Sequence, residues 1–160
     1  MARPQRGKEY ALRLEQIEIP RPGAGEALVR VHAAAITRDE LEWSLDRLPA
    51  IPSYELSGVV VEVIDGHGLV SVGDNVYALA PFDRDGAAAD YAVVPANALA
   101  PKPRALGHVE AAALPLTALS AWQGLVVHGR LQAGHRVLIH GPGGGVSHPV
   151  VQIARHRGGT

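Results

Sequence analysis

The chain has 160 residues, of which 47% are hydrophobic, so it can bury one core, or one domain with a small appendage. Its 15 lysines and arginines nearly balance 16 aspartates and glutamates, and with a formal net charge of -1 no extended field exists to attract nucleic acid or an anionic membrane. The absence of cysteine excludes disulfides and thiolate chemistry, and no apolar run reaches the ~18 residues that span a bilayer, so we expect a cytoplasmic protein without a membrane partner.

Residues 10–103 show the pattern of a β-rich domain. Short apolar or alternating runs are separated by turn signals rich in Gly, Pro and Asp. The expected strands are YALRLEQIEI, EALVRVHAAAI, SGVVVEVI, NVYALA and ADYAVVP. Strands this short and closely spaced predict a small barrel or sandwich. Residues 37–48 interrupt the pattern, and either Thr37 or Asp39 is placed to cap a brief helix there.

After Pro103 the pattern changes to helix. The run GHVEAAAL is rich in alanine, and Pro115 opens a second helical segment that we expect to stop at Gly129. A buried-type strand is expected at 137–140, followed by a glycine-rich turn and a helix over 146–157. The chain therefore predicts two domains, 1–115 and 116–160.

The glycine-rich turn HGPGGGVSH has the chemistry of a phosphate cradle. Residues without side chains let the backbone approach a pyrophosphate, and the amides and dipole of the following helix favour negative charge. The glycines that meet this requirement are Gly141, Gly143, Gly144 and Gly145. Pro142 removes one amide from the cradle.

These segments, in this order, resemble the medium-chain dehydrogenase/reductase superfamily in its zinc-free quinone oxidoreductase (zeta-crystallin-like) branch. The resemblance is carried by LPLTALSAWQGLVVHGRLQAGHRVLIHGPGGGVSHPVVQIARHRG and, upstream, by YELSGVVVEV, VGDNVYAL and ADYAVVPANALAPKP. It implies a mostly β fold with α: a GroES-like β-barrel followed by helices and one incomplete Rossmann β–turn–α unit. It also implies NADP(H) as the cofactor and a quinone or enone as the small-molecule substrate.

The resemblance further implies a set of site residues. Thr37, Tyr54 and Ser120 match positions that face the nicotinamide and the substrate in quinone oxidoreductase relatives. A Tyr54 hydroxyl can donate a hydrogen bond to a carbonyl oxygen as that oxygen gains charge, while Asp39 or Glu55 orients it or moves a proton. Ser147 takes the place of the last glycine of the family's turn, and its small side chain keeps the cofactor site feasible.

Zinc is not expected. Zinc-dependent relatives carry a Cys and a His at the positions that are Thr37 and Tyr54 in this chain, and neither residue is a suitable ligand. The eight histidines show no His-x-x-x-His pair that a nearby carboxylate supports, so we expect no catalytic metal.

Three functional alternatives stay open at this point. The first is a quinone or enone oxidoreductase, of which the chain forms the N-terminal portion or pairs with a partner that supplies the rest, since we do not expect the chain to complete a cofactor site alone. The second is a stand-alone, cofactor-independent protein that uses the barrel to bind or cyclise a small molecule such as a polyketide, and the third is a partial product without activity. Because the apolar run 137–139 lacks a full sheet to join, we also expect a homo-oligomer, unless the run folds back onto the barrel.

Overall fold

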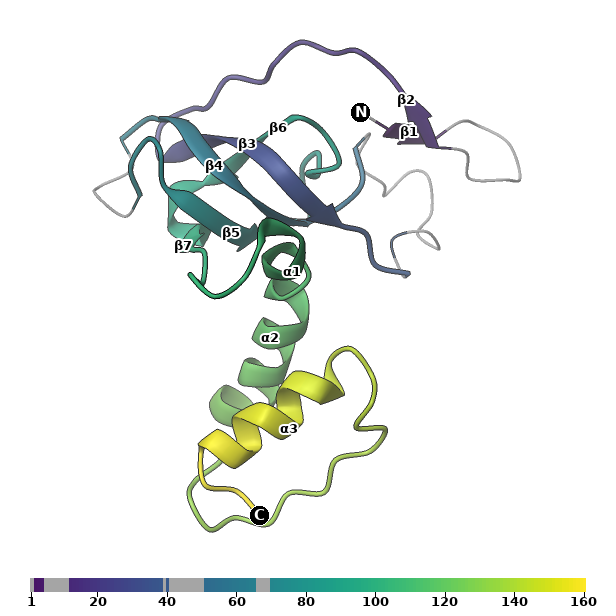
Figure 1. Cartoon of the computed structure of the whole chain (residues 1–160), viewed down its shortest axis with the longest axis vertical. Coiled ribbons are helices and arrows are strands. Elements are labelled where there is room, and N and C mark those ends of the chain that lie inside the picture. Colours follow the sequence, from purple (N-terminus) through teal and green to yellow (C-terminus); the bar gives the residue numbers. More distant parts are fainter. Residues whose placement is uncertain (1, 5–11, 39, 41–50, 66–69) are drawn as a thin grey trace. The chain divides into compact units, whose positions relative to one another are not determined.

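The computed structural model describes residues 2–4, 12–38, 40, 51–65 and 70–160 (Figure 1). The chain divides into two compact units, Met1–Ala113 and Leu114–Thr160, and each is described by itself. We keep 1–115 and 116–160 as the proposed domains, since compact packing units and folding domains need not coincide.

The first unit is built on a five-stranded antiparallel sheet in the order β6-β3-β4-β5-β7, with a separate two-stranded β1-β2 sheet (Figure 1). The strands are β1 (Ala2–Pro4), β2 (Leu12–Leu14), β3 (Glu26–Ala35), β4 (Glu55–Val63), β5 (Asn75–Leu79), β6 (Tyr91–Pro95) and β7 (Ala100–Pro101). The four expected strands downstream of residue 25 are confirmed. The first expected strand is too long: β1 pairs only with residues 12–14, so the ladder ends there.

The core of the first unit lies on the sheet. Its fully buried side chains come from β3, β4, β5 and β6, and include Val29, Leu56, Val60, Val76 and Val94. Strands β3 and β4 approach each other closely at an irregularity in their register, where a Cβ on Gly58 would lie 2.1 Å from the carbonyl oxygen of Arg30. Glycine is therefore required at position 58.

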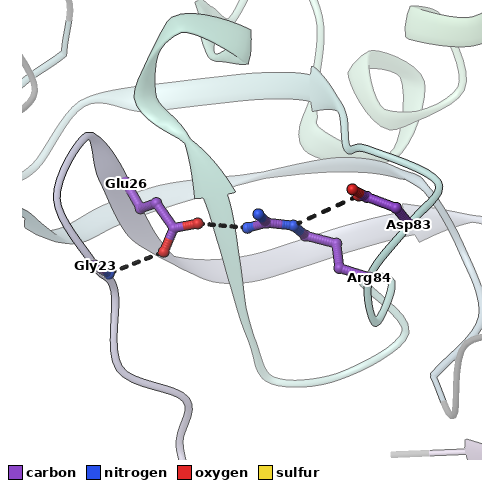
Figure 2. Close-up of polar contacts among 4 residues, drawn as sticks. All are labelled: Gly23, Glu26, Asp83 and Arg84. Carbon is purple, nitrogen blue, oxygen red and sulfur yellow. Dashed lines mark hydrogen bonds and ion pairs between the residues drawn. The ribbon is translucent and has the colours of Figure 1, made fainter.

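An ion pair ties the start of β3 to the loop that precedes β6. The guanidinium of Arg84 lies 2.6 Å from Glu26 Oε1, and Glu26 Oε2 accepts a 2.9 Å hydrogen bond from the Gly23 N–H, while Asp83 lies 3.9 Å from Arg84 (Figure 2). The hydrogen bond from Arg84, followed by that from Gly23, holds the pKa of the Glu26 carboxyl below its usual value. These contacts anchor the loop that also carries Gly86. That loop holds part of the candidate site described below.

The helices are η2 (Ala96–Ala98), α1 (His108–Ala112), α2 (Pro115–Trp122), the π-helical η3 (Gln123–His128) and α3 (Ser147–His156). The alanine-rich helix is confirmed as α1, which packs against β3, β4 and β5. Pro115 occupies the first turn of α2, and Gly129 caps the end of η3, both as expected. None of the helices that the structure describes has the length and hydropathy that a bilayer crossing requires.

Two expectations about local structure need correction or stay untested. The segment 137–140 is not a strand; its backbone makes a parallel-type pair of bonds with the end of the chain, from the Val137 N–H to the Thr160 carbonyl (2.9 Å) and from the Thr160 N–H to the His135 carbonyl (3.0 Å). One such pair cannot form a ladder, and Leu138 is 82% exposed rather than buried. The helix expected at 37–48 lies outside the described residues except at Thr37, Arg38 and Glu40.

Candidate functional site

A buried carboxylate connects the segment after β3 to the turn before β4. Glu40 is 4% exposed, and its Oε1 accepts hydrogen bonds from the Thr37 N–H (2.9 Å) and from the Thr37 hydroxyl (3.1 Å). Its other oxygen, Oε2, accepts a bond of 2.7 Å from the Ser53 N–H. Both oxygens of one side chain thus fix Thr37 relative to Ser53.

Ser53 holds a conformation that few residues other than glycine adopt. Its φ is 75°, in the left-handed region, which costs on the order of 1 kcal/mol for a side-chain-bearing residue. The buried hydroxyl lies within hydrogen-bond distance of two carbonyl oxygens, those of Ala35 (2.8 Å) and Glu55 (3.0 Å). These bonds and the one to Glu40 offset the backbone strain and define the direction in which the chain enters β4.

The loop after Phe82 holds the same turn from the other side. The N–H groups of Gly86 and Ala87 donate to the carbonyls of Ile51 (2.8 Å) and Ser53 (2.6 Å), and the Asp85 carboxylate accepts from the Ile51 N–H (3.2 Å). A Cβ on Gly86 would lie 2.1 Å from the Ser53 carbonyl oxygen, so only glycine allows this approach.

Tyr54 lies at the end of this turn with a buried side chain. Its ring is 2% exposed and packs against the half-exposed ring of Phe82, with centroids 4.4 Å apart and a 46° tilt. Burial raises the pKa of the Tyr54 phenol to about 12, and the negative charges of Glu40 and Asp85 act in the same direction. The phenol is therefore a protonated hydrogen-bond donor at neutral pH.

The structure brings two of the three expected catalytic residues into one neighbourhood. Thr37 and Tyr54 are joined through Glu40 and the Ser53 backbone, whereas Asp39 lies outside the described residues. Glu40 was not among the residues predicted from the sequence. The pattern Thr-x-x-Glu was a visible signal, because a glutamate three residues after a capping threonine returns a bond to the threonine N–H in a capping box.

The glycine turn lies in the second unit and starts at a left-handed Gly141 (φ 59°). The Gly144 N–H closes the turn onto the Gly141 carbonyl (3.0 Å), and a Cβ on Gly143 would meet no atom within 4 Å. The hydroxyl of Ser147 donates to the His140 carbonyl (3.3 Å), so this serine holds the shape of the turn.

The amides at the start of α3 fit a phosphate. No side chain caps this ten-residue helix, and within the described residues no acceptor engages the N–H groups of Gly143, Gly145 or Val146. These donors, together with the helix dipole, suit a doubly anionic pyrophosphate. Thr117 of α2 approaches the turn, with its methyl 3.8 Å from the position of a Cβ on Gly145. The exposed Ser120 follows one helical turn later on α2.

The described residues contain no group of three or more His, Asp or Glu side chains arranged to hold a metal ion. Thr37 and Tyr54, which the family resemblance matches to zinc-ligand positions, carry hydroxyl groups. That the protein binds no zinc stays a prediction.

The fold and the two sites define a GroES-like domain of the alcohol dehydrogenase type, followed by the start of a nucleotide-binding unit. The family model described as "Alcohol dehydrogenase GroES-like domain" matches residues 23–104. The chain belongs to this family and, with its relatives, to the medium-chain dehydrogenase/reductase superfamily.

Curated relatives and solved structures agree with this assignment. The chain is 31% identical to the chloroplastic quinone-oxidoreductase homolog of Spinacia oleracea, covering 93% of this chain and 49% of the relative. It is 33% identical to the chloroplastic NADPH-dependent alkenal/one oxidoreductase of Arabidopsis thaliana, covering 91% and 41%. A crystal structure of an alcohol dehydrogenase superfamily protein from Novosphingobium aromaticivorans superposes with a TM-score of 0.84 at 34% identity, covering 94% and 48%. The chain thus spans about half the length of these relatives. Because two of them are chloroplastic, a cytoplasmic location stays a prediction.

Proposed function

We propose that the chain provides the substrate site and the phosphate cradle of a zinc-independent, NAD(P)H-dependent reductase of quinones or enones. The observation that carries this proposal is the link from Thr37 through Glu40 to Ser53 and Tyr54, at the two positions where zinc-dependent relatives carry metal ligands. A protonated phenol such as that of Tyr54 can donate to a carbonyl and polarise it without a metal. The names of the two plant relatives, one a quinone-oxidoreductase homolog and the other an NADPH-dependent alkenal/one oxidoreductase, support the same reaction class.

The glycine turn is the part of this chain that would hold the cofactor. NAD(P)H, when bound, supplies the hydride that reduces the substrate. The amides of Gly143, Gly145 and Val146 would donate to its phosphate oxygens, and the missing side chain at Gly143 leaves space for them. Ser147 and Ser120 are proposed cofactor neighbours, the first because it fixes the turn and the second from its position on α2.

Tyr54 and Thr37 have complementary roles in the proposed substrate site. The Tyr54 phenol stays protonated and donates to the substrate carbonyl as that oxygen gains charge. The Thr37 hydroxyl donates a hydrogen bond to Glu40 Oε1, so towards a ligand it acts as an acceptor of an N–H or O–H group and not as a donor to the carbonyl. Phe82 packs against the Tyr54 ring and helps to fix its position. Asp39 stays a candidate for proton transfer on the family resemblance alone.

Quinone-dependent oxidation of NADPH by this chain, joined to the remainder of the nucleotide-binding domain of a relative, tests this function. We expect turnover that survives dialysis against a chelator, and a Tyr54→Phe variant that loses about tenfold to a hundredfold in kcat/KM because one carbonyl donor is gone. Tyr77→Phe is the matched control, since Tyr77 is a half-buried tyrosine of β5 that is not part of the Thr37–Glu40–Ser53–Tyr54 link. Absence of turnover, or turnover that the chelator abolishes, would contradict the proposal.

The comparisons give no support to the alternative of a cofactor-independent protein that binds or cyclises a small molecule. The names of these relatives refer to oxidoreductases or to the alcohol dehydrogenase superfamily, and the matches cover 91–94% of this chain. We therefore do not propose that alternative.

A further inference from the structure

We propose that Glu40 is the positioning residue of the substrate site: its carboxylate fixes Thr37 and the backbone of Ser53 relative to each other, and so places the hydroxyls of Thr37 and Tyr54 to receive one ligand. This inference rests on the proposed function for what the two hydroxyls bind. The arrangement itself rests on three hydrogen bonds to one buried side chain.

The geometry requires a carboxylate. Oε1 accepts from the N–H and the hydroxyl of Thr37, and Oε2 accepts from the Ser53 N–H at 2.7 Å, the shortest of the three bonds. A glutamine has only one acceptor oxygen, so its NH₂ group would face either the Thr37 donors or the Ser53 donor. One backbone N–H would then be buried beside another donor, which costs more than the loss of a single bond.

The position of the bond to Ser53 explains why Glu40 affects Tyr54. Ser53 has its left-handed φ of 75°, and Tyr54 is the next residue, at the entry to β4. Releasing the Ser53 N–H removes one of the contacts that offset this strain, and a small rotation of the Ser53 backbone displaces the Tyr54 ring. The N–H groups of Gly86 and Ala87 bind the carbonyl oxygens of Ile51 and Ser53. Glu40 instead binds the N–H group of Ser53, so the two sets of bonds hold opposite ends of this residue.

Electrostatics adds a second effect to the same residue. The charge of Glu40 follows burial among the causes that raise the pKa of Tyr54, ahead of the charge of Asp85. A carboxylate beside a buried phenol opposes the formation of a phenolate, since two negative charges repel in a medium of low dielectric constant. Glu40 therefore places the Tyr54 phenol and adds to the effect of burial in raising its pKa.

The test replaces every tyrosine with 3-fluorotyrosine and follows the four signals by ¹⁹F NMR as the pH is raised. Fluorine lowers the pKa of each phenol, so each titration midpoint lies at a pH at which the protein stays folded. Tyr54→Phe assigns the Tyr54 signal. In Glu40→Gln we expect this signal to titrate at a lower pH than in the wild type, while the other three do not move. Glu62→Gln is the matched control, because Glu62 is an exposed glutamate of β4.

A second variant separates position from charge. Glu40→Asp keeps the charge but shortens the side chain by one methylene, so we expect a displaced Tyr54 chemical shift with a titration midpoint that stays high. If Glu40→Gln fails to fold, Glu40→Asp alone decides the positioning claim. A Tyr54 signal with wild-type shift and midpoint in the variants that fold would overturn the inference.

This readout requires neither cofactor nor substrate, so it separates the two proposals. If the ¹⁹F results are as expected but the chain joined to the remainder of a nucleotide-binding domain shows no quinone-dependent turnover, the proposed function fails and the role of Glu40 in placing Tyr54 stands. If turnover is present but Glu40→Gln leaves kcat and the Tyr54 signal unchanged, the inference fails and the function stands.

Discussion

The imidazole of His108 is stacked on that of His32, with ring centroids 4.5 Å apart and planes inclined by 17°. The buried hydroxyl of Ser57 lies 2.8 Å from His108 Nδ1 and 2.8 Å from the Val76 carbonyl oxygen. On the other side of the ring, His108 Nε2 lies 3.2 Å from Asn75 Oδ1, and a neutral imidazole donates through one of its two nitrogens and accepts through the other. Through His32 and Ser57, His108 connects α1 to strands β3 and β4.

Acid should weaken this connection. Burial, and then the charges of His32 and Lys102, hold the pKa of His108 below its ordinary value of 6.5. The unfolded chain therefore binds the proton more tightly, so the stability that neutral His108 contributes is present above pH 6.5 and is lost as the pH falls through the lower folded pKa. In His108→Gln we expect the melting temperature to decrease less steeply with acidification, as circular dichroism can measure. His128→Gln, at an exposed histidine of η3, should keep the wild-type slope; identical slopes in all three proteins would refute this prediction.

Gly86 should tolerate no side chain. A Cβ there would lie 2.1 Å from the Ser53 carbonyl oxygen, a backbone atom that cannot move aside cheaply. We expect Gly86→Ala to destabilise the first unit by about 3 kcal/mol, the scale of a forced backbone shift in a packed core. Denaturant unfolding measures this change. Gly124→Ala is the control, because a Cβ at position 124 meets nothing within 4 Å and its effect should be small. Equal stability of the two variants would show that the 51–54 turn is not held as described.

Self-association should depend on the segment 137–139. Leu138 is 82% exposed, and among the described residues the backbone of this run bonds to another segment at Val137, whose N–H donates to the Thr160 carbonyl. An extended segment with exposed apolar side chains and unpaired backbone N–H and C=O groups favours pairing with a second copy. We expect the chain to be an oligomer by light scattering, and Leu138→Lys to shift it towards the monomer. Val109→Lys, at a similarly exposed valine of α1, should leave the oligomer intact. A wild-type chain that stays monomeric at high concentration would contradict this expectation.

The sequence predicted those parts of the fold that local patterns determine. Alternation in EALVRVHAAAI and the turn signals around it predict β3 because both depend only on neighbouring residues. The segment 137–140 has the composition of a strand but not the structure, since strand formation also needs a partner along its whole length. The family resemblance, rather than periodicity, supplied the order of the two units.

The candidate site was predictable only in part, because several of its contacts join residues that are distant in the sequence. Thr37 and Tyr54 followed from the resemblance, whereas Glu40 was not predicted, although the Thr-x-x-Glu pattern is typical of a capping box. The bond from Ser53 to Glu40 joins residues 13 apart in the sequence, and no local rule relates them. The burial of Tyr54 beneath Phe82 likewise depends on packing between distant segments.

The most direct test of the account is an NADPH titration of the ¹⁵N-labelled chain, followed at individual backbone amides. We expect saturable shifts at the amides of Gly143, Gly145, Val146 and Ser147, because these donors would hold the cofactor's phosphates, and we expect Gly143→Asp to abolish them by placing a negative charge in the cradle. If millimolar NADPH leaves these amides unmoved, or moves them equally in Gly143→Asp, the proposal that this chain contributes a cofactor site is wrong.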